Sequence, residues 1–418
     1  MRTRIVTFTL AVAAVVGATP PRLGIAQLLP ATLPSVHVRV TGDPTPVETL
    51  RLAILTTARA AVPEVRDSQV ALEQTAPPLQ PLPLAADVAL RAVVQVSWSG
   101  LRSLTTTVPV EITNASFPWS DAGELLVSNS PETLAFGKVL LDGALSAGQT
   151  VRLLYHHQNG SASQHMTIAV NLSNPARTPI ELWLTGAAGD AGGDELVIGH
   201  AAARAFLDQY WHHAGFMLRI PPNTTVPLFL HDLAPGAVAS GLVQLGLIDG
   251  DRLNLQVFAR LDGEVDPPTA SYAPDVDKIH RRGVFEHPSF VRSLSFTVGD
   301  PLVSMMVGDD RDALRESQTG AVLNGNYGVV YTFPVELDNP RPLPAMLGLV
   351  MQAVGGQAGA TILADGRIFD IPQVRSGDRR LVTTIHLAPG EHRRLVISTM
   401  PESGANYPIR LTLGSQYQ

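Results

Sequence analysis

The segment Val170–Pro175 reads VNLSNP and is followed by Pro179, and a near copy, VELDNP at Val335–Pro340, is followed by Pro344. In both places an alternating apolar and polar run is typical of a strand, and Asn-Pro is typical of the turn that ends it. Two such units in one chain favour two similar β-sandwich modules. Coincidence between common turn residues is the alternative interpretation.

The similarity continues beyond these turns. Ile220–Asn223 (IPPN) precedes one pair of strand-like runs, and Leu387–Gly390 (LAPG) precedes another. Charged residues form 16% of the chain, against about 25% in an average soluble protein, and 35 glycines and 33 prolines can supply many turns. We therefore expect a mainly β fold with tandem β-sandwich-like modules, one inserted short helix, and a small α+β domain in front.

Periodicity sets the expected boundaries. Thr45–Glu48 (TPVE) has the pattern of a capping box with proline at the first helical position, which predicts a helix running to about Ala61. In the run 198–213, Ala203, Phe206, Leu207 and Tyr210 share one helical face. The expected order is a small α+β domain at 34–115, a β-sandwich module with the inserted helix at 123–262, a linker or long loop at 263–289, and a second β-sandwich module at 290–418.

The first residues have the features of a signal peptide, predicted at 1–26. Arg2 and Arg4 precede an apolar run, Ile5–Ala18, and small residues follow at Gly24–Ala26. An uncleaved anchor is the alternative, although this run is shorter than the about 20 residues that cross a bilayer. No later segment is apolar enough to span. We expect an exported protein of the periplasm, the cell envelope or the extracellular space.

Composition excludes several classes of site. The chain has no cysteine, which excludes disulfides, thiolate metal sites and cysteine nucleophiles. A net charge of -7 disfavours a nucleic-acid partner, because such proteins need a basic surface. Neither Gly-x-Ser-x-Gly nor His-Glu-x-x-His occurs. The sequence therefore assigns no catalytic residue and no cofactor.

Four short blocks stand out along the chain: Val127–Glu132 (VSNSPE), Leu154–Gly160 (LYHHQNG), Ile198–His200 (IGH) and Asn326–Tyr331 (NYGVVY). They resemble blocks of an uncharacterised family of secreted bacterial proteins, best known from cyanobacteria, that carry a domain of unknown function. The resemblance covers about Leu125–Leu413 and leaves the N-terminal domain outside. It implies an extracytoplasmic location and brings no assigned activity or catalytic residue.

Histidines and aromatic residues supply the candidate binding residues. His156 and His157 are neighbours in a predicted strand, so their side chains should point to opposite faces. Asp208 and His212 lie four residues apart on the predicted helix and could share a metal ion, although a zinc site needs further ligands. The alternative is a helix packed on a sheet, with Trp211 covering its end. The candidate ligand-binding residues are Tyr155, His156, His157, Asn159, His200, Trp211 and Tyr327.

These features favour a secreted or envelope-associated, non-enzymatic protein whose modules bind a glycan or another surface protein. Two other functions stay open. One is a metal-dependent or carboxylate-based hydrolase with its site beside the 198–213 helix, suggested by the histidines there. The other is a structural spacer in an envelope assembly, which would show mostly covered aromatic rings.

Overall fold

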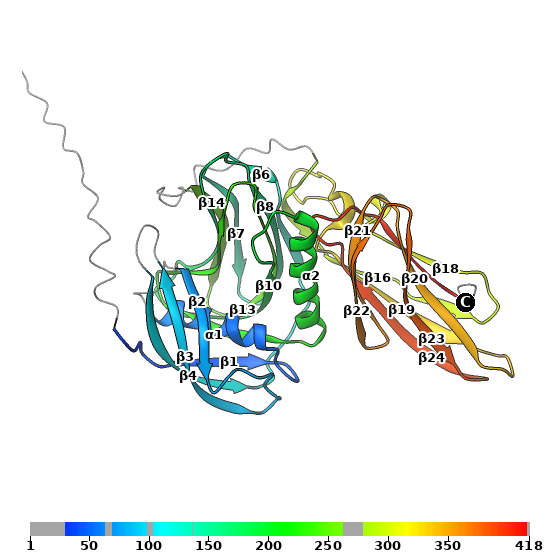
Figure 1. The fold of residues 1–418 in the computed structure, drawn as a ribbon, viewed down its shortest axis with the longest axis horizontal. Helices are drawn as coiled ribbons and strands as arrows, with labels where there is room; N and C mark the ends of the chain where they lie inside the picture. Colours follow the sequence, from blue (N-terminus) through cyan, green and yellow to red (C-terminus); the bar gives the residue numbers. More distant parts are fainter. Residues whose placement is uncertain (1–29, 63–68, 98–102, 136, 262–278, 416–418) are drawn as a thin grey trace, which may run out of the picture.

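The computed structural model describes residues 30–62, 69–97, 103–135, 137–261 and 279–415, so the predicted signal peptide lies outside it. The described chain is mainly β, as expected, and has two α-helices, α1 (Val47–Ala61) and α2 (Glu195–Trp211). Its strands form four sheets that pack in pairs, which gives two sandwiches side by side (Figure 1). No helix in the described residues is long and apolar enough to cross a membrane.

The first sandwich pairs an eleven-stranded sheet with a four-stranded sheet across one hydrophobic core. The large sheet contains, in spatial order, β15 (Arg282–Glu286), β5 (Glu124–Ser128), β8 (Thr150–Asn159), β13 (Val238–Asp249), β10 (Ile180–Ala188), β11 (Gly215–Ile220), β1 (Val36–Thr41), β4 (Leu104–Asn114), β3 (Asp87–Ser97) and β2 (Gln69–Ala76), with β6 (Thr133–Leu134) beside β8. The small sheet contains β12 (Thr224–Leu233), β9 (Met166–Asn174), β14 (Arg252–Leu261) and β7 (Lys138–Ser146).

The second sandwich is built in the same way from a six-stranded and a four-stranded sheet. The larger contains β16 (Ser289–Val291), β19 (Val330–Asp338), β24 (His392–Thr399), β21 (Ala358–Ala364) and β22 (Arg367–Val374), with β17 (Leu294–Thr297) also beside β19. The smaller contains β18 (Val303–Val307), β25 (Ile409–Gly414), β20 (Ala345–Ala353) and β23 (Arg379–Leu387).

The N-terminal segment shares its sheet with the first module. Strand β1 pairs in parallel with β4 and antiparallel with β11, so one sheet runs through both predicted units. Helix α1 covers this region and buries Leu50, Ala53 and Ile54. The predicted end of this helix near Ala61 is confirmed.

Two local predictions are wrong. The Thr45–Glu48 capping box does not form, because Thr45 is held in an extended bridge with Leu82 and no side chain caps α1. The predicted linker 263–289 ends in a strand, since Arg282–Glu286 forms β15 and pairs with β5. Residues 263–278 lie outside the described part of the chain.

The two Asn-Pro turns have matching hydrogen bonds. The Nδ2 of Asn174 donates to the carbonyls of Thr178, Ile220 and Pro221. The Nδ2 of Asn339 likewise donates to the carbonyls of residues 343, 387 and 388. In each case the side-chain oxygen accepts from the backbone two residues on. Each asparagine thus joins its own turn to the end of a strand distant in sequence, while a repeat across whole modules remains a prediction.

Helix α2 stands between the sandwiches (Figure 1). The predicted helix is confirmed, but it begins earlier than expected, at Glu195, because the Asp194 carboxylate accepts from the backbone N–H groups of Leu196 and Val197. Gly199 lies inside the helix, where a Cβ atom would come within 1.9 Å of the carbonyl oxygen of Ser403. Glycine is needed here because the backbone of the second sandwich touches the helix.

A second hydrophobic core crosses the boundary between the sandwiches. It joins Leu125 and Leu154 on the outer face of the large sheet, Phe206 of α2, and the interior of the second sandwich. The two sandwiches therefore form one packed unit around α2.

Candidate functional site

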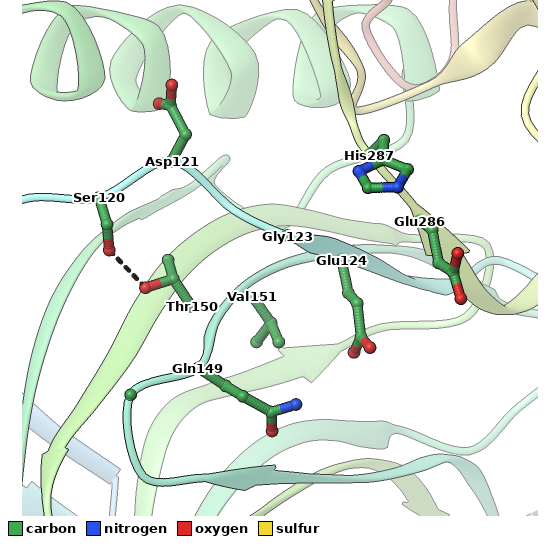
Figure 2. Close-up of a pocket in the computed structure, with 10 residues that line it drawn as sticks. Ser120, Asp121, Gly123, Glu124, Gln149, Thr150, Val151, Glu286 and His287 are labelled. Carbon is green, nitrogen blue, oxygen red and sulfur yellow. Dashed lines mark hydrogen bonds between the residues drawn. The ribbon is translucent and has the colours of Figure 1, made fainter.

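A cleft of about 400 Å³ opens at the edge of the large sheet, where the chain enters β5 and where β15 ends. Most of the residues that line it have polar side chains, although apolar atoms form the larger part of its surface, and they come from three segments (Figure 2). These lining residues are Ser120, Asp121, Gly123, Glu124, Gly148, Gln149, Thr150, Val151, Glu286 and His287.

A hydrogen-bonded network contacts two lining residues of the cleft, Ser120 and Thr150. The hydroxyls of Ser120 and Thr150 lie 2.6 Å apart, and the amide of Gln244 donates to the Ser120 carbonyl. The fully buried Arg152 then donates twice to the Gln244 side-chain oxygen, and also to the backbone carbonyls of residues 288 and 328. Thr150 and Arg152 belong to β8 and Gln244 to β13, so the network ties the loop at Ser120 to two strands of the large sheet.

Among the described residues no carboxylate forms an ion pair with the fully buried Arg152, although the charge of Asp121 acts on its guanidinium. Burial lowers the pKa of its guanidinium, and the group lies 5.4 Å from the ring centroid of Tyr210 and 5.9 Å from that of Phe206. Ring faces and carbonyl oxygens together compensate the cation. This fits a supporting role beneath the cleft.

Aromatic rings gather beside the cleft. The Trp119 ring, next to Ser120 in the chain, is half-buried and stacks on His213 with centroids 5.0 Å apart. It also contacts Trp183 at 4.6 Å. The hydroxyl of Tyr210 donates to Asp121 at 2.6 Å, so this carboxylate turns toward α2 (Figure 2).

The lining has an acidic balance. Asp121, Glu124 and Glu286 bring three carboxylates, whereas His287 is the one histidine and no lysine or arginine lines the cleft. His287 has a φ of 57°, and its N–H donates to the carbonyl of Gly123. A non-glycine residue in the left-handed region costs roughly 1–2 kcal/mol. A lining that carries carboxylates and no lysine or arginine among the described residues favours neutral or cationic ligands with hydrogen-bond donors.

His200 joins the two sandwiches. From α2 its Nδ1 donates to Glu402 and its Nε2 to Asp370, each at 2.6 Å, and Arg204 also pairs with Asp370. Burial acts to lower the pKa of His200, but the two carboxylates outweigh it and raise the pKa to about 9. Glu402 is fully buried and accepts two more hydrogen bonds from Thr361. The imidazolium of His200 therefore links α2 to the second sandwich through Glu402 and Asp370, and this group of three residues is called the clasp below. Both ring nitrogens of His200 are engaged in it.

His156 and His157 have different surroundings, as the alternation of β8 predicts. His157 contacts the Ser128 hydroxyl and the Pro131 carbonyl, and burial lowers its pKa to about 3. His156 is also buried, yet neither ring nitrogen has a hydrogen-bond partner. Leaving such a buried group unsatisfied costs about 1–3 kcal/mol.

The remaining candidates from β8 lie inside the first sandwich. Tyr155 is fully buried, and its hydroxyl contacts the Nε2 of His231 at 2.7 Å. Asn159 is also buried; its Nδ2 donates to the carbonyls of residues 164 and 233, and its oxygen accepts from the N–H of Ser161. These contacts are the ones that hold a core and a turn together.

Of the candidates on and beyond α2, Asp208 and His212 contact each other, whereas Trp211 and Tyr327 pack on the second core. Trp211 and Tyr327 are half-buried against the second core, and the Tyr327 hydroxyl donates to the carbonyl of Ala405. His212 contacts the carbonyl and the carboxylate of Asp208 at the exposed end of the helix. Among the described residues no third metal-ligating side chain joins this pair.

Sequence reasoning missed the cleft. Its acidic residues, Asp121, Glu124 and Glu286, come from a loop and from the ends of two strands, and no motif connects them. Trp119 followed by Ser-Asp is the one local signal, since an aromatic residue beside polar residues in a loop is a common binding arrangement.

Comparisons with known proteins assign no family. No family model matches the chain, and no curated protein matches it. The resemblance to a secreted bacterial family therefore remains a prediction.

Solved structures give weak likenesses. An anti-sigma factor domain-containing protein has 10% identity over 66% of this chain and 87% of its own, with a TM-score of 0.17. A tandem CBM22 structure from Paenibacillus barcinonensis Xyn10C has 9% identity over 68% and 92%, with a TM-score of 0.15. The M60 catalytic domain with two CBM51 domains from Clostridium perfringens ZmpB has 6% identity over 82% and 43%, with a TM-score of 0.13. Likenesses at these scores carry no functional assignment.

Proposed function

We propose that this chain is an exported binding protein that takes a neutral or amine-bearing glycan in the cleft beside Trp119. The observation that carries the proposal is the cleft itself, whose lining combines the carboxylates of Glu124 and Glu286 and the amide of Gln149 with a buried network beneath them. Sugar hydroxyls are donors and acceptors that such groups can satisfy together. Export rests on the signal-peptide pattern of the first 26 residues.

The lining supports a choice among glycans. The carboxylates of Glu124 and Glu286 line the cleft, and no arginine or lysine does so among the described residues, so a uronate or sulfated sugar would meet like charge. An amino sugar would instead bring a cation to the carboxylates. The exposed part of the half-buried Trp119, whose ring also packs on His213 and Trp183, offers apolar surface to a sugar beside Ser120.

The test is binding of the mature chain to a panel of neutral, amine-bearing and acidic oligosaccharides, followed by isothermal titration of the best binder. We expect saturable binding of neutral or amine-bearing sugars, and weakening of at least tenfold in Glu124→Gln and Trp119→Ala. Glu336→Gln, an exposed change on the second sandwich, serves as the matched control and should bind normally.

Preference for acidic glycans, or equal binding by Glu124→Gln and wild type, would refute the cleft as the site. Capture of a single envelope protein without any glycan binding would support the other partner class and also refute this proposal. A surface-protein partner is thus an outcome of the same experiment.

A further inference from the structure

A second cluster of polar side chains lies away from the cleft. Glu132 follows β5, His156 belongs to β8, and Glu195 is the first residue of α2. One ligand-type atom from each of these three residues lies within 4.8 Å of the other two. Side chains of three distant segments converge here.

His156 provides an independent sign of a missing ligand. Its side chain is 1% exposed, and neither Nδ1 nor Nε2 has a hydrogen-bond partner. Both nitrogens of this buried imidazole are therefore available to a ligand. A buried polar group of this kind normally has a partner, either in the protein or in a bound species.

The carboxylates make a cation the fitting partner. Glu132 and Glu195 bring two carboxylates of like charge within 4.8 Å of each other and of the His156 ring. A bound cation would attract both carboxylates and offset their repulsion. His280 lies 2.9 Å from Glu132 through its Nε2, in the position of an outer partner that orients a ligating carboxylate.

We propose that Glu132, His156 and Glu195 bind one divalent first-row transition ion of the zinc type. The imidazole donor favours such an ion over calcium or magnesium, which prefer oxygen ligands alone. Donors that lie about 2.0–2.2 Å from one tetrahedral ion are roughly 3.3–3.6 Å apart. The ligand-type atoms of the three residues lie within 4.8 Å of one another, so binding needs a closure of at most about 1.5 Å, which rotation of the two glutamate side chains can supply.

The site joins the first sandwich to the start of α2. Since Gly199 and His200 of the same helix contact the second sandwich, a metal ion here would fix the helix at one end while the clasp fixes it further along. With three protein ligands, a fourth position stays open to water or to an external ligand. The inference does not depend on the glycan cleft.

The test is a titration of chelator-treated full-length protein with Zn²⁺, and with Co²⁺ as a spectroscopic probe. We expect one ion per chain, visible absorption typical of nitrogen and oxygen ligation with Co²⁺, and no competition from millimolar Ca²⁺. Glu195→Gln, an exposed change that should leave folding intact, should weaken binding at least tenfold, and His156→Ala should abolish it.

The control is His212→Ala, which removes an exposed histidine from the other end of α2 and should bind the metal normally. Far-UV circular dichroism and a thermal melt without metal show whether each variant is folded. Absence of a saturable site in the wild type, or wild-type affinity in folded Glu195→Gln and His156→Ala, would overturn the proposal. Loss of binding only in His212→Ala would assign the ion to Asp208 and His212 instead and would also overturn it.

Discussion

The clasp between His200 and Glu402 predicts a specific dependence of stability on pH. His200 has a pKa of about 9 in the folded protein and an ordinary value of 6.5. A group whose pKa is raised by folding contributes its full stability below the unfolded pKa and loses it as the pH rises through the folded pKa. The free energy of unfolding should therefore fall between pH 6.5 and pH 9.

The size of the effect follows from the shift. At about 1.4 kcal/mol per pKa unit, the rise in the pKa of His200 corresponds to roughly 3 kcal/mol of folding stability for the whole clasp. Asp370 has a side chain that is 42% exposed and is screened by solvent, whereas the Glu402 side chain is fully buried. We assign most of the effect to Glu402 and expect Glu402→Gln to lower the free energy of unfolding by about 2 kcal/mol at pH 6.

The assay is urea unfolding at pH 6, 8 and 10, followed by tryptophan fluorescence, which includes Trp211 at the end of α2, and by circular dichroism as a second probe. The difference between wild type and Glu402→Gln should shrink as the pH rises, because His200 loses its charge. Glu336→Gln should stay within about 0.5 kcal/mol of wild type at each pH. An equal loss at pH 6 and pH 10 would show that the variant disturbs packing, and it would refute the charge-based reasoning.

Three further perturbations test the architecture. Gly199→Ala should destabilise the protein by about 3 kcal/mol, because the new methyl group meets backbone of the second sandwich. The control is Gly193→Ala, whose new methyl group has nothing within 4 Å and which should melt like wild type. Equal melting temperatures of the two variants would contradict the contact at Gly199. Asn174→Ala and Asn339→Ala should each lower the free energy of unfolding by about 2–3 kcal/mol, since each removes the donor to three carbonyls. Chemical denaturation measures this loss. A loss in only one of the two variants would show that the two turns contribute unequally to stability. Arg152→Met should cost about 3 kcal/mol and weaken ligand binding in the cleft, because the network behind it loses its donors; unchanged calorimetric binding would separate the network from the site.

Local patterns gave the fold class but not the pairing of distant strands. The apolar face of α2 and the Asn-Pro turns depend on neighbours in sequence, so residues such as Phe206 and Asn174 were identified correctly. The pairing of β1 with β11 joins segments far apart in the chain, and no short window contains it. Strand β15 falls in the segment predicted as a linker or long loop, because that segment is polar and carries four prolines, at positions 267, 268, 274 and 288.

The candidate sites show the same limit. Alternation along β8 predicted that His156 and His157 would face opposite ways, because that property belongs to a single strand. The approach of Glu132 and Glu195 to His156 depends on how a turn and a helix end pack on that strand. Likewise, Glu402 reaches His200 from a part of the chain about two hundred positions away, and one sequence carries no signal of that contact.

The second hydrophobic core determines how the chain can be dissected. A cut within residues 262–278 would leave β15 on the C-terminal fragment, although this strand pairs with β5 of the first sandwich. It would also separate Leu125, Leu154 and Phe206 from the apolar surface that they cover. Each fragment would then expose an apolar surface of the kind that drives aggregation. The two sandwiches should therefore be expressed as a single polypeptide. Each half expressed alone should lose the protease resistance that it has in the intact chain.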